Sequence, residues 1–216
     1  MNTGDTAFMM ICAALVFFMT PGLAFFYGGL VRRKNVCNTI MACVAIMGLS
    51  VVMWTLFGYS LSFGGNHAGI IGDFRWFGLN GVGMEAGPYA DSIPHLVFCA
   101  FQMMFAMITP ALITGSLVGR MKFKALFLFV AIWSVIVYYP MTHMVWGDGG
   151  FLAAIGSVDF AGGDVVHISS GISALVLAII LGRRRGYEHT TYRIHNIPSV
   201  VLGASLLWFG WFGFNA

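Results

Sequence analysis

Few residues of this chain are ionisable, and some of those few lie in otherwise apolar stretches. Asp159 and Asp164 precede or open one such stretch and His167 lies within it, while His95 and His143 lie near the ends of two others. If these stretches cross a membrane, a central charge costs at least about 2.5 kcal/mol to insert, so each residue is a candidate for binding or moving a charge. An imidazole also titrates near neutrality and exchanges protons readily. The residue types therefore indicate cation or proton chemistry.

Each of these residues also has an ordinary structural interpretation. A carboxylate at the start of a helix accepts hydrogen bonds from free backbone N–H groups and meets the positive end of the helix dipole. We expect this capping role for Asp164, and for Asp159 both capping and an electrostatic contribution to an outer cation site. A lone histidine one turn into an apolar helix, as His167 is, is more often a core residue than a ligand or a relay. Both interpretations of His167 stay open on the sequence alone.

Aromatic residues offer a second kind of cation site. Phe98, Phe101 and Phe105 share one helical face, and Trp146 lies at the end of the next apolar stretch. Such residues are usually core, lipid-facing or interface anchors, yet a ring face also attracts a cation by about 0.5–2 kcal/mol. The spacing does not choose between these roles. It shows no metal-ligand pattern and no nucleophile–base pair, so we expect no metal, no cofactor and no enzymatic activity.

The elements that position these residues follow from the composition. The chain has 216 residues, of which 59% are hydrophobic and 9% are charged, with a net charge of +3. A soluble domain usually carries about 25% charged residues, so lipid is the main solvent here. This excludes a disordered chain, a soluble enzyme domain and a nucleic-acid binder. The four cysteines show no framework spacing, and we expect buried thiols.

Six uncharged stretches are long enough to cross a bilayer, which takes about 20 residues. They cover residues 6–31, 35–63, 94–119, 125–145, 165–182 and 197–216. None shows the alternating pattern of a transmembrane strand, and the first lacks the basic start and short length of a signal peptide. We predict an all-α polytopic membrane protein with about six transmembrane helices. Small residues from Ser169 to Ala174 predict close helix packing around the fifth.

Basic residues give the expected orientation. They form three groups after the first, third and fifth stretches: Arg32, Arg33 and Lys34; Arg120, Lys122 and Lys124; Arg183, Arg184, Arg185 and Arg193. Cytoplasmic loops concentrate Lys and Arg, so these loops are expected inside and the N-terminus outside. The loops 64–93 and 146–163 are acidic, with Arg75 as their only Lys or Arg, as expected of the outer side.

Several motifs resemble those of one known family. Residues 159–184, DFAGGDVVHISSGISALVLAIILGRR, resemble the signature of the Amt/Mep/Rh ammonium transporters. TPGLAFFYGGLVRRKN at 20–35, HMVWGDGG at 143–150 and WFGWFGFNA at 208–216 resemble the Amt branch of that family. The resemblance covers essentially the whole chain. It implies an eleven-helix fold of two inverted five-helix repeats and a final helix, of which 1–216 is an incomplete first part: 6–182 the first repeat and 197–216 the sixth helix.

The resemblance also implies an activity and partners. It implies transport of ammonium or ammonia, with methylammonium as an analogue, for nitrogen uptake across the plasma or inner membrane. A homotrimer with one pore per subunit is implied as well, and a cytoplasmic regulatory protein is a further candidate partner. Two alternatives stay open: the membrane domain of an ammonium sensor, and a truncated fragment that does not conduct. The sequence beyond residue 216 would discriminate between them.

Residue roles carry over by motif position. Trp146, Phe101 and Phe105 would recruit ammonium by cation–π contacts, supported by the buried acid Asp159. Phe105 and Phe214 would be two rings stacked as a gate. His167 would be the first of the family's paired pore histidines, which accept hydrogen bonds from ammonia and relay its proton.

Two departures from the family pattern matter. Asp148 stands in HMVWGDGG where the family commonly has Gly, and we expect its charge to strengthen cation capture, within the limits of solvent screening. The second histidine and the serine that follows GFNA in the family are not in this sequence. Pores of such folds form between the repeats, so we expect one chain of this length to need the rest of the fold for a complete pore.

Overall fold

The computed structural model describes residues 1–184, 186–187, 189 and 191–216; Arg185, from the third basic group, lies outside these residues. Over the described part of the chain, six helical stretches are long and apolar enough to cross a membrane, which confirms the prediction of an all-α, multi-pass integral membrane protein. These stretches are Thr3–Leu30, Arg33–Phe63, His95–Leu117, Phe123–Ala154, Gly163–Leu181 and Ile197–Phe214. The helices within them are α1 (Thr3–Leu30), α2 (Val36–Met53), α3 (Tyr59–Phe63), α4 (His95–Leu117), α5 (Phe123–Trp133), α6 (Tyr139–Trp146), α7 (Phe151–Ala154), α8 (Ser169–Leu181) and α9 (Ile197–Phe214).

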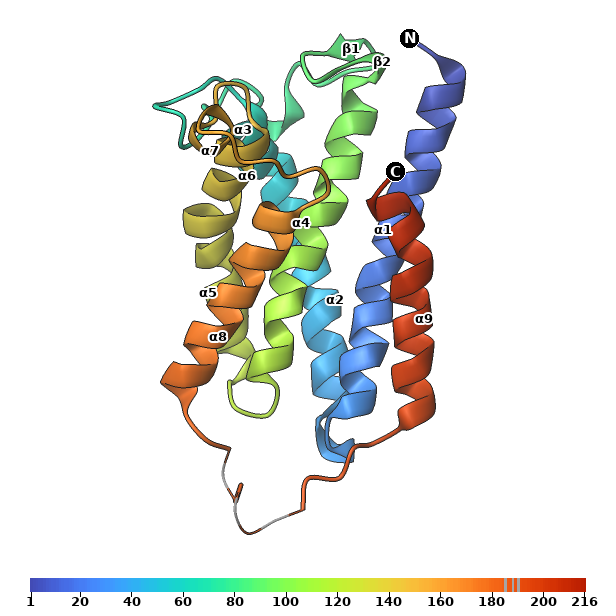
Figure 1. The fold of residues 1–216 in the computed structure, drawn as a ribbon, viewed down its shortest axis with the longest axis vertical. Helices are drawn as coiled ribbons and strands as arrows, with labels where there is room; N and C mark the ends of the chain where they lie inside the picture. The colour runs from blue at the N-terminus through green and yellow to red at the C-terminus, as the bar shows by residue number, and fades with distance from the viewer. Residues whose placement is uncertain (185, 188, 190) are drawn as a thin grey trace.

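The helices run roughly parallel to one long axis, with the connections gathered at its two ends (Figure 1). At one end a short hairpin, β1 (Ala86–Gly87) and β2 (Ala90–Pro94), pairs antiparallel with an irregular register. The sequence predicts a loop over residues 64–93, because such short strands carry little pattern of their own. We call this the hairpin end. The other end holds the connections 31–35, 118–122 and 182–196, and we call it the basic end.

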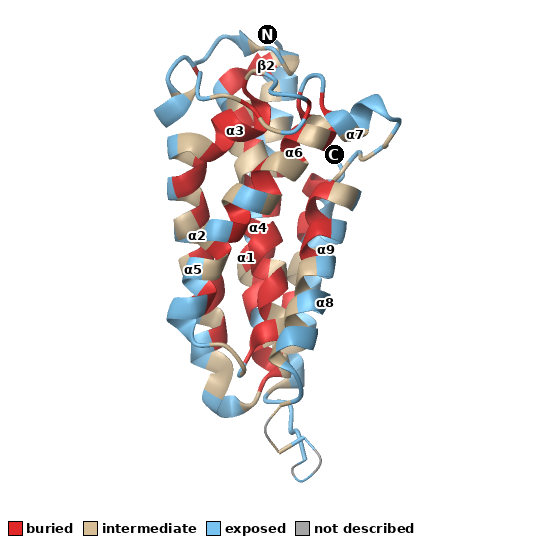
Figure 2. Cartoon of the chain, turned by 90° about the vertical axis from the view of Figure 1, so that its left-hand side faces the viewer, coloured by how far each residue is buried: buried red, intermediate tan, exposed pale blue. Residues whose placement is uncertain are grey.

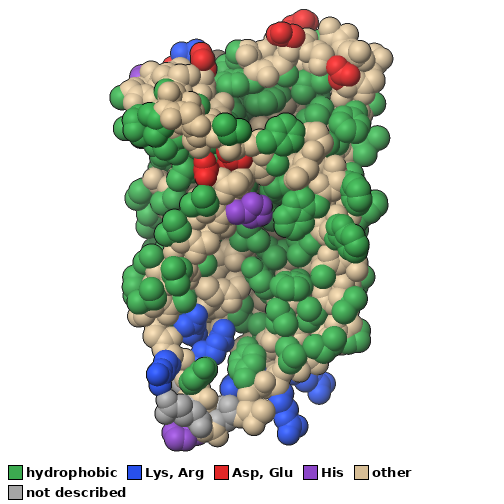
Figure 3. Space-filling view, viewed as in Figure 1, with side chains coloured by type: hydrophobic (Ala, Val, Ile, Leu, Met, Phe, Trp, Pro, Cys, Tyr) green, Lys and Arg blue, Asp and Glu red, His purple; other side chains and the backbone are tan. Residues whose placement is uncertain are grey.

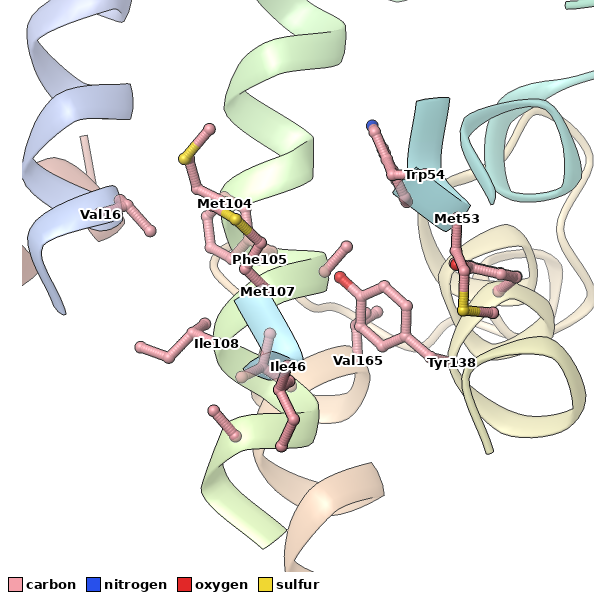
Figure 4. Close-up of a cluster of buried hydrophobic side chains, with 14 of the residues drawn as sticks. Val16, Ile46, Met53, Trp54, Met104, Phe105, Met107, Ile108, Tyr138 and Val165 are labelled. Atoms are coloured by element: carbon pink, nitrogen blue, oxygen red, sulfur yellow. The ribbon is translucent and has the colours of Figure 1, made fainter. Parts of the chain in front are cut away.

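Helix α4 is the centre of the bundle. Of its most apolar window 61% is buried, against 22% for the spans that contain α8 and α9, and the buried residues follow the middle of the molecule (Figure 2). Met104, Phe105, Met107 and Ile108 of α4 meet side chains from neighbouring helices (Figure 4). Helices α8 and α9 therefore each leave one apolar face uncovered in this chain.

Close helix packing occurs between α1 and α9, which lie side by side (Figure 1). A Cβ on Gly22 would come within 2.9 Å of Leu206 Cβ, and a Cβ on Gly203 within 2.6 Å of Gly22 O. Glycine lets the two backbones approach to this distance. The prediction of such packing around the fifth span fails at Gly171, where a Cβ would meet nothing within 4 Å. The face of α8 that carries Gly171 has no neighbouring helix in this chain.

Three of the four cysteines are buried, as predicted: Cys12, Cys43 and Cys99. The prediction is wrong for Cys37, which is exposed. Cys37 lies one residue into α2, where the helix emerges at the basic end. A residue at the end of a span has fewer helices around it than one at mid-depth.

Three single turns of π-helix interrupt the spans, at Trp54–Gly58, Ser134–Tyr138 and Gly163–Ile168. Turns of this kind are rare and occur often at functional sites. The second precedes Pro140, which has no N–H and so cannot donate the backbone hydrogen bond that a regular helix would make there. The third carries His167, which makes this turn part of the candidate site.

Candidate functional site

The residues predicted for the recruitment site and the gate line one cavity at the hairpin end. This hairpin-end cavity has a volume of about 290 Å³. Its lining includes all five of them: Phe101, Phe105, Trp146, Asp159 and Phe214. They come from α4, α6, the connection before α8 and the end of α9. Segments far apart in the sequence therefore converge on one space, as the motif resemblance implied.

Four of the aromatic rings that line this cavity form one connected group. Phe105 is its centre, with ring centroids 5.0 Å from Phe101, 5.7 Å from Trp146 and 4.7 Å from Phe214. The Phe101 and Trp146 contacts are edge-to-face, a geometry that such rings prefer. Phe105 and Phe214 are tilted by 59°, so they do not stack face to face as the expected gate would. They are nevertheless in contact and form the floor of the cavity.

The carboxylate of Asp159 organises the turn beneath Trp146. It accepts hydrogen bonds from four successive backbone N–H groups, those of residues 162–165, at 2.5–3.0 Å. Hydrogen bonds to an ionised acceptor are stronger than neutral ones. The Asp159 carbonyl accepts a further bond from Trp146 Nε1 at 2.9 Å. One residue therefore caps the fifth span and fixes the indole, which agrees with the capping half of the prediction.

Asp164 differs from its prediction. The capping role expected of it belongs to Asp159, and its own carboxylate accepts a hydrogen bond from Ser157 Oγ at 2.6 Å. Both acids precede a helix, and only the backbone path decides which one reaches the free N–H groups. Gly162 sets that path with a φ of +96°, in the left-handed region that favours glycine. A Cβ there would also lie 2.6 Å from Val166 Cγ2.

His167 lies directly beyond the floor of the hairpin-end cavity. Its ring stacks on Trp211, with centroids 6.0 Å apart and an interplanar angle of 18°, and lies 5.9 Å from Phe214. It lines a second cavity of about 200 Å³, whose walls come from α1, α4, the third π turn and α9. Phe214 lines both cavities. One ring therefore separates the aromatic site from the histidine.

Two more cavities continue toward the basic end. Tyr27 and Leu112 line the histidine cavity and also a third, largely apolar cavity of about 480 Å³. Arg184 and Tyr192 line that third cavity and also a fourth of about 470 Å³. Shared walls thus connect four cavities in one row, from the hairpin end past His167 to the basic end.

Asp148 lies beside the site rather than in it. It is exposed and does not line the hairpin-end cavity. Its backbone N–H donates to the Tyr89 hydroxyl at 3.2 Å, and that hydroxyl donates to Phe63 O at 2.8 Å. Burial, together with the negative charge of Asp148, raises the pKa of Tyr89 despite the backbone hydrogen bond. The phenol is therefore neutral near pH 7 and remains a donor.

Three residues that sequence analysis did not select take part in the row of cavities. Gln102 lines the hairpin-end cavity, and its Oε1 is buried without a hydrogen-bond partner among the residues described. Trp211 covers one face of His167, and the Tyr27 hydroxyl donates to Leu112 O at 2.9 Å. A polar amide at membrane depth was the signal available for Gln102. For the other two the sequence holds no signal, because aromatic residues are common in every span.

Neither His95 nor His143 joins this site. The Tyr59 hydroxyl lies 2.5 Å from His95 Nε2, and Ser62 O lies 3.0 Å from His143 Nδ1. Both imidazoles are buried under the loops of the hairpin end. They are satisfied core residues. Over the part of the chain that the structure describes, no group of three or more His, Cys, Asp or Glu could hold a metal ion.

Known proteins match this chain in sequence and in structure. The model of the Ammonium Transporter Family matches residues 7–216. An ammonium transporter of Bacillus subtilis is 51% identical over 100% of this chain and 52% of its own length. The crystal structure of Saccharomyces cerevisiae Mep2 aligns with a TM-score of 0.88 and 35% identity, over 100% of this chain and 50% of that one.

A structure named Sensor Amt Protein aligns with a TM-score of 0.86 and 31% identity, over 98% of this chain and 53% of that one. The chain spans about half the length of the curated relatives it matches. The family model nevertheless covers nearly all of its residues. The chain belongs to the ammonium transporter family.

Proposed function

We propose that this chain forms part of a pathway for ammonium or ammonia across the membrane. Ammonium binds among the rings of the hairpin-end cavity, loses its proton, and passes as ammonia beyond Phe105 and Phe214 to His167. The released proton either crosses the membrane through His167 or returns to the water at the hairpin end. Because the chain spans about half the length of its relatives, the remainder of the fold would complete the walls that α8 and α9 leave open.

One observation carries this proposal. The hairpin-end cavity, which has aromatic walls and Asp159 as its acid, adjoins the apolar cavity that contains His167. Ring faces attract a cation, and the three rings around Phe105 lie within 6 Å of it. The next cavity offers His167 as its only ionisable side chain besides the Tyr27 phenol. His167 is exposed in this chain. Once the remainder of the fold covers it, a cation attracted to the first cavity would face the cost of leaving water before the second.

The cost of removing a cation from water lets the pathway select ammonium over metal cations by chemistry as well as by size. Potassium and ammonium ions are similar in size, but only ammonium can donate directional hydrogen bonds and give up a proton. A metal cation keeps its charge and its desolvation penalty in an apolar cavity, whereas ammonia enters as a neutral molecule. An imidazole nitrogen of His167 would accept a hydrogen bond from it.

The distribution of charge supports an orientation with the hairpin end outside. Lys and Arg side chains gather at the basic end, and acidic side chains at the hairpin end (Figure 3). Positive residues favour the cytoplasmic side. The N-terminus of α1 lies at the hairpin end (Figure 1), so this orientation places it outside. Tagging the N-terminus and testing its accessibility in intact cells would check the assignment.

His167→Asp is the sharpest test of the pathway. An aspartate keeps a polar, protonatable group but holds a negative charge that stabilises a passing cation. In proteoliposomes that hold this chain joined to the remainder of a relative, we expect ammonium-evoked current to persist and discrimination against K⁺ to be lost. His189→Asp, at an exposed residue between α8 and α9, is the matched control and should keep wild-type selectivity. Full selectivity in His167→Asp would remove the role we give to this histidine.

The length of the chain requires a second arm of the experiment. Proteoliposomes with this chain alone and with the chain joined to the remainder of a relative should be compared for methylammonium uptake. We expect uptake only with the joined protein. If the joined protein folds and inserts but neither binds nor takes up ammonium, the result favours a non-conducting scaffold.

An ammonium sensor is the second candidate, favoured by the alignment with the Sensor Amt Protein. A sensor would bind ammonium in the same hairpin-end cavity but need not pass it on. Ammonium binding without uptake in the joined protein, together with a signalling segment beyond residue 216, would favour this function. A short tail and measurable uptake would favour transport.

Assembly and regulation follow from the family membership as further proposals. We propose a homotrimer, which native mass spectrometry in mild detergent would test. A cytoplasmic protein that contacts the basic end is the candidate regulator, and crosslinking in cells from that end would identify it.

A further inference from the structure

The basic end holds a cavity that ammonium transport does not explain. This basic-end cavity has a volume of about 470 Å³ and lies between the connections 31–35, 118–122 and 182–196. Five cations line it: Arg32, Lys34, Arg120, Arg183 and Arg184. No Asp or Glu is among its lining residues in the described parts of the chain. A pathway for a cation has no use for such a concentration of positive charge.

Two of these cations are fixed by the ends of helices. Arg120 Nη1 donates to Gly182 O at 2.7 Å and Nη2 donates to Ser116 O. Arg184 Nη1 donates to Val118 O at 2.6 Å. Cations commonly satisfy the free carbonyl groups at helix C-termini, so this pair ties the end of α4 to the end of α8. That structural role accounts for these two residues, but not for the other cations on the same cavity.

An aromatic ring brings a further cation, Arg32, close to Arg184. The guanidinium carbons of Arg32 and Arg184 lie 5.0 Å and 5.3 Å from the ring centroid of Tyr192. Burial and the positive charge of Arg184 lower the pKa of Arg120 from its ordinary value. Like charges held this closely repel each other. An anion between them would relieve the repulsion.

The neighbouring third cavity indicates what kind of anion fits. It shares Arg184 and Tyr192 with the basic-end cavity, has a similar volume and is lined mainly by apolar side chains such as Leu30 and Leu112. A charged group in one cavity could therefore carry an apolar or aromatic part into the other. Guanidinium groups match phosphate oxygens in geometry and charge, and basic pockets between helices on the cytoplasmic side bind phosphorylated headgroups.

We propose that the basic-end cavity binds a phosphate group. The group belongs either to an anionic phospholipid of the adjacent leaflet or to a soluble phosphate compound, since both present the same oxygens to the same cations. Lys34 and Arg183 add positive charge that attracts the phosphate. Arg120 and Arg184 hold together the ends of α4 and α8 that form two walls of the cavity. This proposal does not rest on the proposed transport function, because the test below measures phosphate binding and not uptake.

The test compares two double variants that remove the same charge from the same end. Lys34→Gln with Arg183→Gln removes one Lys and one Arg from the cavity, and neither residue makes the helix-end bonds described above. Lys124→Gln with Arg193→Gln removes one Lys and one Arg from outside it. The purified proteins in phosphatidylcholine nanodiscs are titrated with inorganic pyrophosphate. In a second arm, detergent-solubilised proteins receive short-chain phosphatidylglycerol, and native mass spectrometry counts the retained lipid.

We expect the cavity variant to lose about tenfold or more in affinity, since each cation near a membrane surface contributes on the order of 1 kcal/mol to binding an anionic lipid. The control should lose less than about twofold. Loss in the pyrophosphate arm alone assigns the site to soluble phosphates, and loss in the lipid arm alone assigns it to phospholipid. Equal losses in both double variants, or no binding in either arm, would overturn the proposal. If the double variant fails to fold, the phosphate affinities of the single variants Lys34→Gln and Lys124→Gln are compared instead, since both residues are exposed.

Discussion

The cavities at the two ends of the row are lined by residues of different type and opposite charge. The hairpin-end cavity has aromatic walls and a single acid, Asp159. The basic-end cavity has five cations and no acid among its described lining residues. Both are held by charged side chains that bind backbone: Asp159 accepts from four N–H groups at a helix start, and Arg120 donates to carbonyls at two helix ends.

This contrast follows from the polarity of helices, which favours an acid at one end of a helix and a base at the other. Helix starts present N–H groups and suit a carboxylate, while helix ends present carbonyls and suit guanidinium. The same capping chemistry therefore leaves a negative residue beside one cavity and positive residues beside the other. A cation is drawn to the first and repelled by the second, whereas neutral ammonia is affected by neither. In the pathway that we propose, this contrast would favour ammonia over ammonium as the molecule that leaves at the basic end.

The largest expected effect comes from Asp159→Asn. An amide keeps one acceptor oxygen, so at least two of the four N–H groups lose their partner, and each buried unpaired group costs about 1–3 kcal/mol. We expect a loss of about 3 kcal/mol in the free energy of unfolding and the loss of uptake. Thermal unfolding in detergent, followed by uptake in proteoliposomes, measures both.

Asp164→Asn is the matched control for that change. Asp164 opens the same span but accepts from Ser157 Oγ alone, and an amide oxygen can accept that bond. We expect its stability to change by less than about 1 kcal/mol. Equal destabilisation of the two variants would contradict the capping role of Asp159.

Trp146→Leu should weaken recruitment without unfolding the protein. The variant removes one ring face and the indole bond to Asp159 O. A cation–π contact of about 0.5–2 kcal/mol corresponds to an apparent affinity about two- to thirtyfold lower. Methylammonium uptake over a range of low concentrations measures this. Trp208→Leu, at a Trp that is 73% exposed on α9, should leave the affinity unchanged, and a matching loss there would point to lipid anchoring.

Gln102→Leu should give a smaller loss in the same assay. Gln102 lines the cavity, and its Oε1 is buried without a hydrogen-bond partner among the residues described, so an ammonium N–H would supply one. Removing one hydrogen bond of about 0.5–1.5 kcal/mol lowers the apparent affinity about two- to tenfold. Gln102→Glu should strengthen ammonium binding instead. An unchanged affinity in both variants would exclude Gln102 from the site.

The smallest expected effect belongs to Asp148→Asn. The side chain is exposed and outside the hairpin-end cavity, so salt screens its charge. We expect an affinity loss of less than about twofold that disappears at high ionic strength. No loss at low ionic strength would refute the idea that Asp148 strengthens cation capture.

The sequence predicted the spans well because charge is so rare in this chain. Each apolar stretch had to cross the membrane, and each of the six coincides with an observed helical span within a few residues, apart from the extension of the fourth to Ala154. The motif resemblance selected Phe101, Phe105, Trp146 and Phe214, which converge on one cavity. Spacing alone gave no reason to prefer these rings over the other aromatic residues.

What escaped prediction depended on contacts between distant segments. Asp159 and Asp164 look equivalent as helix-start acids, and the backbone at Gly162 decides between them. Of the small residues expected to pack around the fifth span, Ser169 and Ser170 are buried but Gly171 meets no neighbour, because small residues act only where a second helix approaches. The row of cavities is likewise a property of four or more helices together and leaves no local pattern.

The most direct test of the proposed pathway is to block the row of cavities between its two ends with a large side chain. Leu112 lines both the histidine cavity and the third cavity, and Leu112→Trp would fill the space between them. Leu128→Trp, at a residue that is 62% exposed on α5, is the control for adding an indole. Methylammonium uptake is measured with both variants in the joined protein, after each is shown to fold and insert. We expect Leu112→Trp to fall to the level of protein-free vesicles and Leu128→Trp to transport normally. Equal uptake by the two folded variants would contradict a pathway through this row of cavities.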